Sequence, residues 1–166
     1  MRKDHRGLSM IELIIVLAVL AILSTGAIGI YRSLGFANTK KAAVYIDNLL
    51  TRARLDTMSK KDRTYVYLYQ IDGRLYSIQS NDGGLSMDPG GGLSVEEGSP
   101  FSRNISLSYI DHSGATCKLE DNQWICISFR RDSGAFDSYY SRLIINSRNS
   151  STEITCVKET GRHWVN

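Results

Sequence analysis

The feature that most constrains this chain of 166 residues is an apolar run near its N-terminus. Leu13–Tyr31 contains 19 residues without a charge. As a helix that rises about 1.5 Å per residue, the run would extend roughly 28 Å, enough to cross the hydrocarbon core of a bilayer. Three basic residues, Arg2, Lys3 and Arg6, precede it and favour a cytoplasmic N-terminus. The sequence therefore predicts a single-pass cytoplasmic (inner) membrane protein with an extracytoplasmic head.

A carboxylate, that of Glu12, stands at the start of this run within "RGLSMIELIIVLAVLAIL". A charge at the centre of a bilayer costs roughly 2.5–3.5 kcal/mol on insertion scales. A cleavable secretory signal, cut in "STGA" at Ser24–Ala27, would need an apolar region of about 7–15 residues, shorter than this one. A plain signal-anchor gives Glu12 no role. The carboxylate of Glu12 is compatible with an apolar environment if it pairs with an opposite charge, because such pairs attract strongly where the dielectric constant is low.

A second helical pattern follows the apolar run. Only "RSLGFA", which contains no Pro, separates the two segments, so we expect one continuous helix. Its first half would be transmembrane and its second half amphipathic. The apolar stripe of the second half recurs at steps of three and four residues and comprises Ala42, Ile46, Leu49, Leu50, Ala53 and Thr57.

Beyond residue 61 the pattern changes to that of strands. In "TYVYLYQIDGRLYSIQ", Val66 and Leu68 alternate with tyrosines, and Asp72–Gly73 is a hairpin turn signal. The Gly-rich stretch Ser80–Pro100 lacks the glycine spacing of phosphate-binding motifs, and we expect it to be a mobile surface loop. The helical stripe and the strand pattern together predict an α+β domain, in which the helix stripe covers one face of an antiparallel sheet. Further strands are expected over Ile105–Ile110, Ala115–Leu119, Gln123–Phe129, Arg142–Ser147 and Thr152–Lys158.

Catalytic patterns are nearly absent from the sequence. There are three histidines, His5, His112 and His163, and no GxSxG, HExxH or CxxC motif. The spacing of the three cysteines matches no common zinc site. Asp111 followed by His112 in "DHSG" is typical of a turn. We therefore predict a protein that is not an enzyme and that uses no metal or cofactor.

The cysteines suggest a covalent link within the head. In "CKLEDNQWIC" a two-residue turn at Asp121–Asn122 would pair Cys117 with Cys126 at a non-hydrogen-bonded position. The Cα atoms there lie about 4.5 Å apart, within the range of about 4.4–6.8 Å of disulfides. The sequence predicts this disulfide, with Cys156 as a buried thiol beside Ile154. The alternative is three small buried apolar side chains.

The N-terminal stretch resembles the class III signal of type IV prepilins and pseudopilins. These proteins have a short basic leader ending in Gly, then a hydrophobic residue, then Glu at the fifth mature position, which Gly7, Leu8 and Glu12 match. The resemblance implies that a prepilin peptidase cuts between Gly7 and Leu8 and methylates the new amine of Leu8. It also implies that Glu12 neutralises the amine of a neighbouring subunit during assembly. The chain departs from the pattern with Leu in place of the commoner first Phe, and without the usual helix Pro.

The resemblance extends into the head and sets the expected domain bounds. "KAAVYIDNLLTRARLDTMSKKDRTYVYLY", "ISFRRDSGAF", "RLIINS" and "EITCVKETGR" are similar to the GspH/FimT group of minor pseudopilins. The implied segments are a leader (1–7), a transmembrane helix (8–31), its amphipathic continuation (32–60) and a β-rich globular head (61–166). The implied fold is pilin-like, and the implied partners are the prepilin peptidase, other pilin subunits and the membrane.

Two functions follow from the resemblance. The first is a structural minor pseudopilin or pilin of a type II secretion pseudopilus or type IV pilus. The second is a DNA-binding minor pilin, because FimT-like DNA-uptake pilins carry a Gly-Arg-any-Arg motif and "GRHW" keeps its first Arg as Arg162. Trp164 replaces the second Arg, and Glu153 and Glu159 offset Lys158, which favours the purely structural function. A signal-anchored surface enzyme, the third reading, lacks candidate residues.

Overall fold

The computed structural model describes residues 10–59, 62–87, 92–95, 97–111, 113–138, 140–148 and 150–166. Within the helix it describes the side chains of residues 10–22 and 36–59. The chain divides into two compact units, Met1–Leu34 and Gly35–Asn166. The predicted leader, with Gly7, and also Leu8 and His112 lie outside the described residues.

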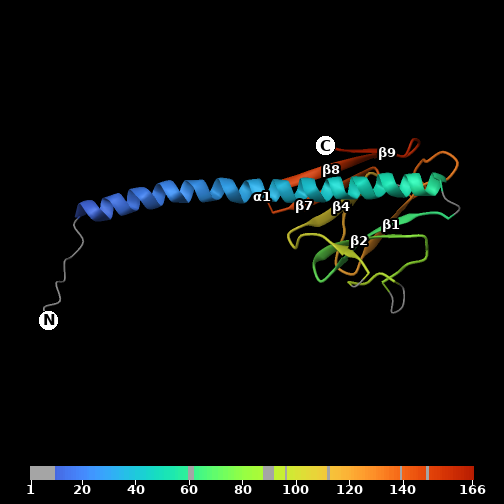
Figure 1. Cartoon of the computed structure of the whole chain (residues 1–166), viewed down its shortest axis with the longest axis horizontal. Helices are drawn as coiled ribbons and strands as arrows, with labels where there is room; N and C mark the ends of the chain where they lie inside the picture. Colours follow the sequence, from blue (N-terminus) through green and yellow to red (C-terminus); the bar gives the residue numbers. More distant parts are fainter. Residues whose placement is uncertain are drawn as a thin grey trace. The chain divides into compact units, whose positions relative to one another are not determined.

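The N-terminal helix, α1, extends from Met10 to Ser59 (Figure 1). No Pro interrupts it, and Ile, Leu and Ala dominate its first turns. Apolar side chains such as Ile11 and Leu13 are exposed along this part. Among the described residues, no helix is both long enough and apolar enough to cross a membrane. The predicted membrane segment, 8–31, includes residues outside that part and stays a prediction.

The second half of α1 buries the stripe that the sequence predicts. Ala42, Ile46, Leu50 and Ala53 are buried in the main core, and Leu49 packs against it half-buried. Burial of a Leu or Ile side chain contributes about 1.5–3 kcal/mol, so this stripe holds α1 on the strands. Thr39, Ala43 and Thr57 are also buried on this face. Thr57 Oγ1 accepts a hydrogen bond from the Thr64 amide at 3.1 Å, which ties the helix end to the first strand.

The described strands form two antiparallel sheets rather than the single sheet expected. The first sheet has the order β3-β2-β1-β6 and the second the order β5-β4-β7-β8-β9. Short strands β3 and β9 were not predicted, whereas the other strands fall within or close to the expected ranges. The bounds are β1 Tyr65–Ile71, β2 Arg74–Ser80, β3 Ser99–Pro100, β4 Ser106–Ile110, β5 Thr116–Lys118, β6 Trp124–Ser128, β7 Arg142–Ser147, β8 Ser150–Val157 and β9 Arg162–Val165.

The β1–β2 hairpin confirms the predicted turn and its two faces. Asp72 and Gly73 have φ angles of 51° and 68°, the two positive values that a type I′ turn requires. Leu68 lies in the main core beside α1, whereas Tyr67 and Tyr69 form a second cluster on the opposite face. The alternation of apolar and tyrosine side chains therefore gives this sheet two buried faces.

The Gly-rich stretch covers the tyrosine face. Tyr67 Oη donates a hydrogen bond to the carbonyl of Asp82, and Tyr69 Oη donates one to the carbonyl of Ser94. Leu93 is only 5% exposed, so the expectation of a surface loop is wrong for this part of the stretch. A Cβ on Gly98 would lie 1.9 Å from Tyr69 Oη, which explains why a glycine stands there.

The predicted pairing of Cys117 with Cys126 is wrong. The turn at Asp121–Asn122 exists, with the Gln123 amide donating to the Glu120 carbonyl. However, β5 pairs with β4 in the second sheet, and β6 pairs with β1 in the first. All three cysteines are free thiols, and Cys156 is buried as expected.

The physical reason is a change of sheet just before the turn. Leu119 is fully buried, and its amide donates to the Leu107 carbonyl in the second sheet. The Asn122 amide instead donates to the Gln70 carbonyl in the first sheet. Burial of Leu119 and these hydrogen bonds draw the two flanking strands into different sheets, so they do not form a hairpin.

Candidate functional site

The first candidate region is the start of α1. Glu12 lies in the first turn of the described helix, where a carboxylate is favoured by the helix dipole. It is exposed and its neighbours Ile11 and Leu13 are 68% and 54% exposed. A continuous apolar surface with one acidic group is typical of a helix that lipid or another protein covers.

The second candidate region is the C-terminal strand, β9, at one edge of the second sheet. Its residues pair with β8, and its side chains alternate between two faces. Arg162 and Trp164 project from the exposed face, with Trp164 45% exposed. His163 and Val165 face α1 and the core. His163, rather than Arg162 or Trp164, packs this strand against α1.

Trp164 is held in place at the exposed face. Its indole Nε1 donates a hydrogen bond to Asn166 Oδ1 at 3.0 Å. Asn166 Nδ2 in turn donates to Thr155 Oγ1 on β8 at 2.8 Å. The ring is therefore fixed by hydrogen bonds while much of its surface stays accessible.

Few charges share this outer face. Because Cα partners across the sheet share a face, Arg142 on β7 and Lys118 on β5 lie on the same side as Arg162. Arg142 forms an ion pair with Glu153 on β8, with a distance of 3.7 Å between Nη1 and Oε2. The described face thus has three dispersed cations and a carboxylate that offsets one of them.

The turn that leads into β9 depends on a close backbone approach. Gly161 has a φ of 63°, and a Cβ there would lie 1.8 Å from the carbonyl oxygen of Gly134. Arg54 of α1 donates to the Gly134 carbonyl at 2.9 Å and to the Thr160 carbonyl at 2.8 Å. The Gly of "GRHW" is therefore required by packing, and Arg54 fastens the helix to two turns at once.

His163 lies inward, a position that the sequence analysis did not predict. Its side chain is 5% exposed and lies against Thr51 and Asp47 of α1. The rings of Phe129 and Phe136 flank it, with centroids 6.3 and 6.2 Å away. The alternation of "RHWV" between polar exposed and buried positions was the signal that could have placed it inward.

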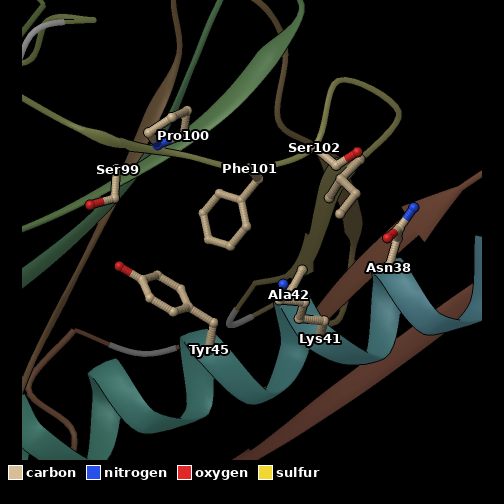
Figure 2. Close-up of a pocket in the computed structure, with 9 residues that line it drawn as sticks. Asn38, Lys41, Ala42, Tyr45, Ser99, Pro100, Phe101 and Ser102 are labelled. Atoms are coloured by element: carbon tan, nitrogen blue, oxygen red, sulfur yellow. The ribbon is translucent and has the colours of Figure 1, made fainter.

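A shallow groove lies between α1 and the segment that includes β3 (Figure 2). Its volume is about 320 Å³. The rings of Tyr45 and Phe101 meet in it edge to face, with centroids 5.5 Å apart, and Lys41 and Asn38 line its rim.

Two titratable groups of the head, Cys156 and Asp111, have roles in the fold. Burial, with the charge of Asp47 nearby, raises the pKa of Cys156 to about 12, so its thiol is unreactive at neutral pH. Asp111 Oδ1 accepts hydrogen bonds from the amides of Ser113 and Ala115, which confirms the predicted turn. Among the described residues, no group of three or more His, Cys, Asp or Glu side chains could hold a metal ion.

Fold and site together define a class: an α+β protein with one N-terminal helix, whose first turn is acidic and apolar, followed by antiparallel sheets. Residues 2–28 match the family model described as the prokaryotic N-terminal methylation motif. This match supports a type IV pilin or pseudopilin, a structural subunit rather than an enzyme. Comparison of the chain with curated proteins and with solved structures finds no match.

Proposed function

We propose that this chain is a minor pseudopilin or minor pilin of the GspH/FimT group. It assembles, through its N-terminal helix, into a type II secretion pseudopilus or a type IV pilus. The observation that carries the proposal is the N-terminal methylation motif at residues 2–28. The protein acts by assembly, with the prepilin peptidase and neighbouring subunits as partners.

Maturation prepares the helix for this role. The prepilin peptidase cuts between Gly7 and Leu8, and the new amine of Leu8 is methylated. Residues 8–31 then anchor the subunit in the cytoplasmic (inner) membrane, 32–60 continue the helix, and 61–166 form the extracytoplasmic head. Exposed apolar side chains along the start of α1 support this step, because lipid or neighbouring helices remove them from water.

Glu12 gives the assembly step its selectivity. A carboxylate among apolar side chains loses its hydration when the helix enters a filament, which costs several kcal/mol unless a partner compensates. The amine of Leu8 in a neighbouring subunit is an opposite charge at the same depth, so the pair forms only when two subunits are in register. The acidic residue thus favours assembled over misplaced helices.

The test is the fate of Glu12→Ala in cells that assemble the filament. We expect the variant to be processed like the wild type and to be absent, or reduced at least about tenfold, from sheared filaments, since each 1.4 kcal/mol lost lowers association about tenfold. Glu120→Ala, which removes a carboxylate from the exposed surface of the head, should assemble normally. Normal incorporation of Glu12→Ala would refute the assembly role.

A second candidate is a DNA-binding minor pilin, favoured by one observation. Arg162 and the fixed ring of Trp164 project from the same exposed face of β9, where a phosphate and a base could be contacted. The weak charge of this face argues against it, because non-specific affinity rises with the number of phosphates neutralised.

A gel shift of residues 38–166 on duplex DNA across a salt series separates the two functions. DNA binding predicts micromolar affinity that falls steeply with salt and is lost in Arg162→Ala. Arg130→Ala, which removes an exposed arginine paired with Asp132, is the matched control and should bind normally. No shift at low salt would leave the purely structural subunit as the function.

A further inference from the structure

The second half of α1 presents positive charge on the side that points away from the strands. Lys40, Lys41 and Arg52 are exposed there, and the apolar Val44 and Leu55 stand between them, 42% and 61% exposed. With about 3.6 residues per turn, these five side chains lie opposite the buried stripe of the helix. None of the three cations forms an ion pair with a residue that the structure describes. These five residues are the basic helix face.

Two carboxylates of the same helix segment turn toward the strands instead. Asp47 is half-buried, and its Oδ1 lies 3.7 Å from His163 Nε2 of β9. Asp56 is also half-buried and accepts a hydrogen bond from Gln79 Nε2 of β2 at 3.3 Å. Among the described side chains of residues 36–59, no carboxylate is exposed. The basic helix face therefore keeps a positive potential.

An acidic surface lies on the Gly-rich stretch. Residues 81–98 include four acidic residues and no basic one. Two of the four, Asp82 and Glu97, belong to the described residues and are exposed, and Val95 is 49% exposed. Arg74, a cation on the same side of the first sheet, donates from its Nε to the Phe101 carbonyl at 2.8 Å. Asp82, Val95 and Glu97 are the acidic loop face.

One molecule cannot join these two faces, because they belong to layers on opposite sides of the first sheet. Leu68 of β1 packs with the buried stripe of α1, whereas Tyr67 and Tyr69 pack with Leu93 of the Gly-rich stretch. A second copy of the chain can join them. Two different surfaces that meet between copies form a heterologous contact, which repeats along an open chain when it does not close into a ring.

We propose that the acidic loop face of one copy docks on the basic helix face of a second copy. The proposal rests on the function proposed above, since a filament is an assembly in which such a contact repeats. Opposite charges attract across the contact, and Val44, Leu55 and Val95 leave water together. Exposed ion pairs contribute little affinity, whereas like charges oppose a slipped register. The contact therefore determines the register between neighbouring copies more than the strength of assembly.

A carbodiimide crosslink between isotope-mixed copies tests the contact directly. The reagent joins a lysine amine to a carboxylate that lies against it and adds no spacer. The sample is an equal mixture of ¹⁴N and ¹⁵N full-length chain in detergent micelles at low salt. We expect peptides that join Lys40 or Lys41 of one copy to Asp82 or Glu97 of another. Absence of these mixed peptides would overturn the docking.

Arg52 provides a variant that changes the contact without changing the crosslinking chemistry. Arg52→Gln removes a charge from the basic helix face but no reactive amine, so we expect the yield of the mixed peptides to fall about threefold, as for the loss of one exposed ion pair. Arg130→Gln, which removes an exposed arginine that follows β6, is the matched control and should keep the yield. An unchanged yield in Arg52→Gln would contradict docking on this face.

Two neutralised variants test the head-to-tail geometry by sedimentation in micelles. Lys40→Gln/Lys41→Gln/Arg52→Gln removes the charge of the basic helix face, and Asp82→Asn/Glu97→Gln removes that of the acidic loop face. Each variant alone should associate more weakly than the wild type. An equal mixture should regain pairs but no longer oligomers, because each copy keeps one intact face. A mixture that associates no better than its components would show that the two faces do not meet.

The Glu12→Ala variant separates this contact from the proposed function. It leaves both faces intact, so it should give the same mixed peptides as the wild type. Mixed peptides in both proteins, with Glu12→Ala incorporated normally into filaments, would support the docking and refute the assembly role of Glu12. No mixed peptides, with Glu12→Ala excluded from filaments, would overturn the docking and leave the proposed function in place.

Discussion

At the scale of single residues, the backbone conformation and the neighbouring atoms decide whether a glycine can be replaced by a larger residue. Gly161 and Gly114 both have positive φ angles, 63° and 82°, but their surroundings differ. A Cβ on Gly161 would strike the carbonyl of Gly134 at 1.8 Å, whereas nothing lies within 4 Å of one on Gly114. The first glycine is required by packing and by backbone conformation, the second by conformation alone.

Substitution of these two glycines by alanine separates the two effects. Gly114→Ala should lower the free energy of unfolding by about 1–2 kcal/mol, the cost of a left-handed alanine. Gly161→Ala should lower it further, to a total loss of about 3–5 kcal/mol, since the turns at Gly134 and Gly161 must separate. Urea unfolding monitored by circular dichroism measures both. Equal losses would show that the close approach at Gly161 contributes nothing.

The free thiols give a second prediction at this scale. Burial raises the pKa of Cys156 to about 12, so almost none of it is thiolate at about pH 8, and alkylating reagents attack the thiolate. We expect Cys117, which is half-buried, to be alkylated in the native protein and Cys156 only after unfolding. Peptide mapping without reduction measures this. A peptide that joins Cys117 to Cys126 would contradict the two-sheet arrangement.

At the scale of elements, periodicity predicted which side chains face inward, but beyond the β1–β2 hairpin it did not predict which strands pair. The α1 stripe and the β1–β2 hairpin could be predicted because each depends on local spacing and on Asp72–Gly73. The separation of β5 from β6 could not, because it depends on burial of Leu119 between distant segments. Strand β9 is only four residues long, so its pattern was too short to recognise, and the inward position of His163 was missed with it.

Helix α1 provides a matched pair of leucines that tests the packing of this element. Leu50 is fully buried against the strands, and Leu55 is 61% exposed on the same helix. Leu50→Ala should lower the free energy of unfolding by about 2–5 kcal/mol through lost burial and a cavity. Leu55→Ala should change it by about 0.5 kcal/mol or less. Similar losses at both positions would show that the helix packs through another face.

At the scale of the whole molecule, the N-terminal motif and the head contribute different information. The N-terminal motif, which the family model matches at residues 2–28, could be recognised from sequence because a basic leader and an acidic residue in an apolar run stand close together. The head offered no such pattern, since its buried thiol and histidine serve the fold. From this contrast we propose that the assembly site lies at the start of the helix.

The mature N-terminus of the protein, isolated from membranes that contain its peptidase, tests the central claim most directly. Intact mass and N-terminal sequencing should give a chain that begins at Leu8 with a methylated amine. Loss of residues 1–7 removes three cations and one carboxylate, which lowers the formal charge from +3 to +1. A chain that begins near Ala27 would show an ordinary secretory signal and would contradict the pilin account, as would a chain that retains Gly7.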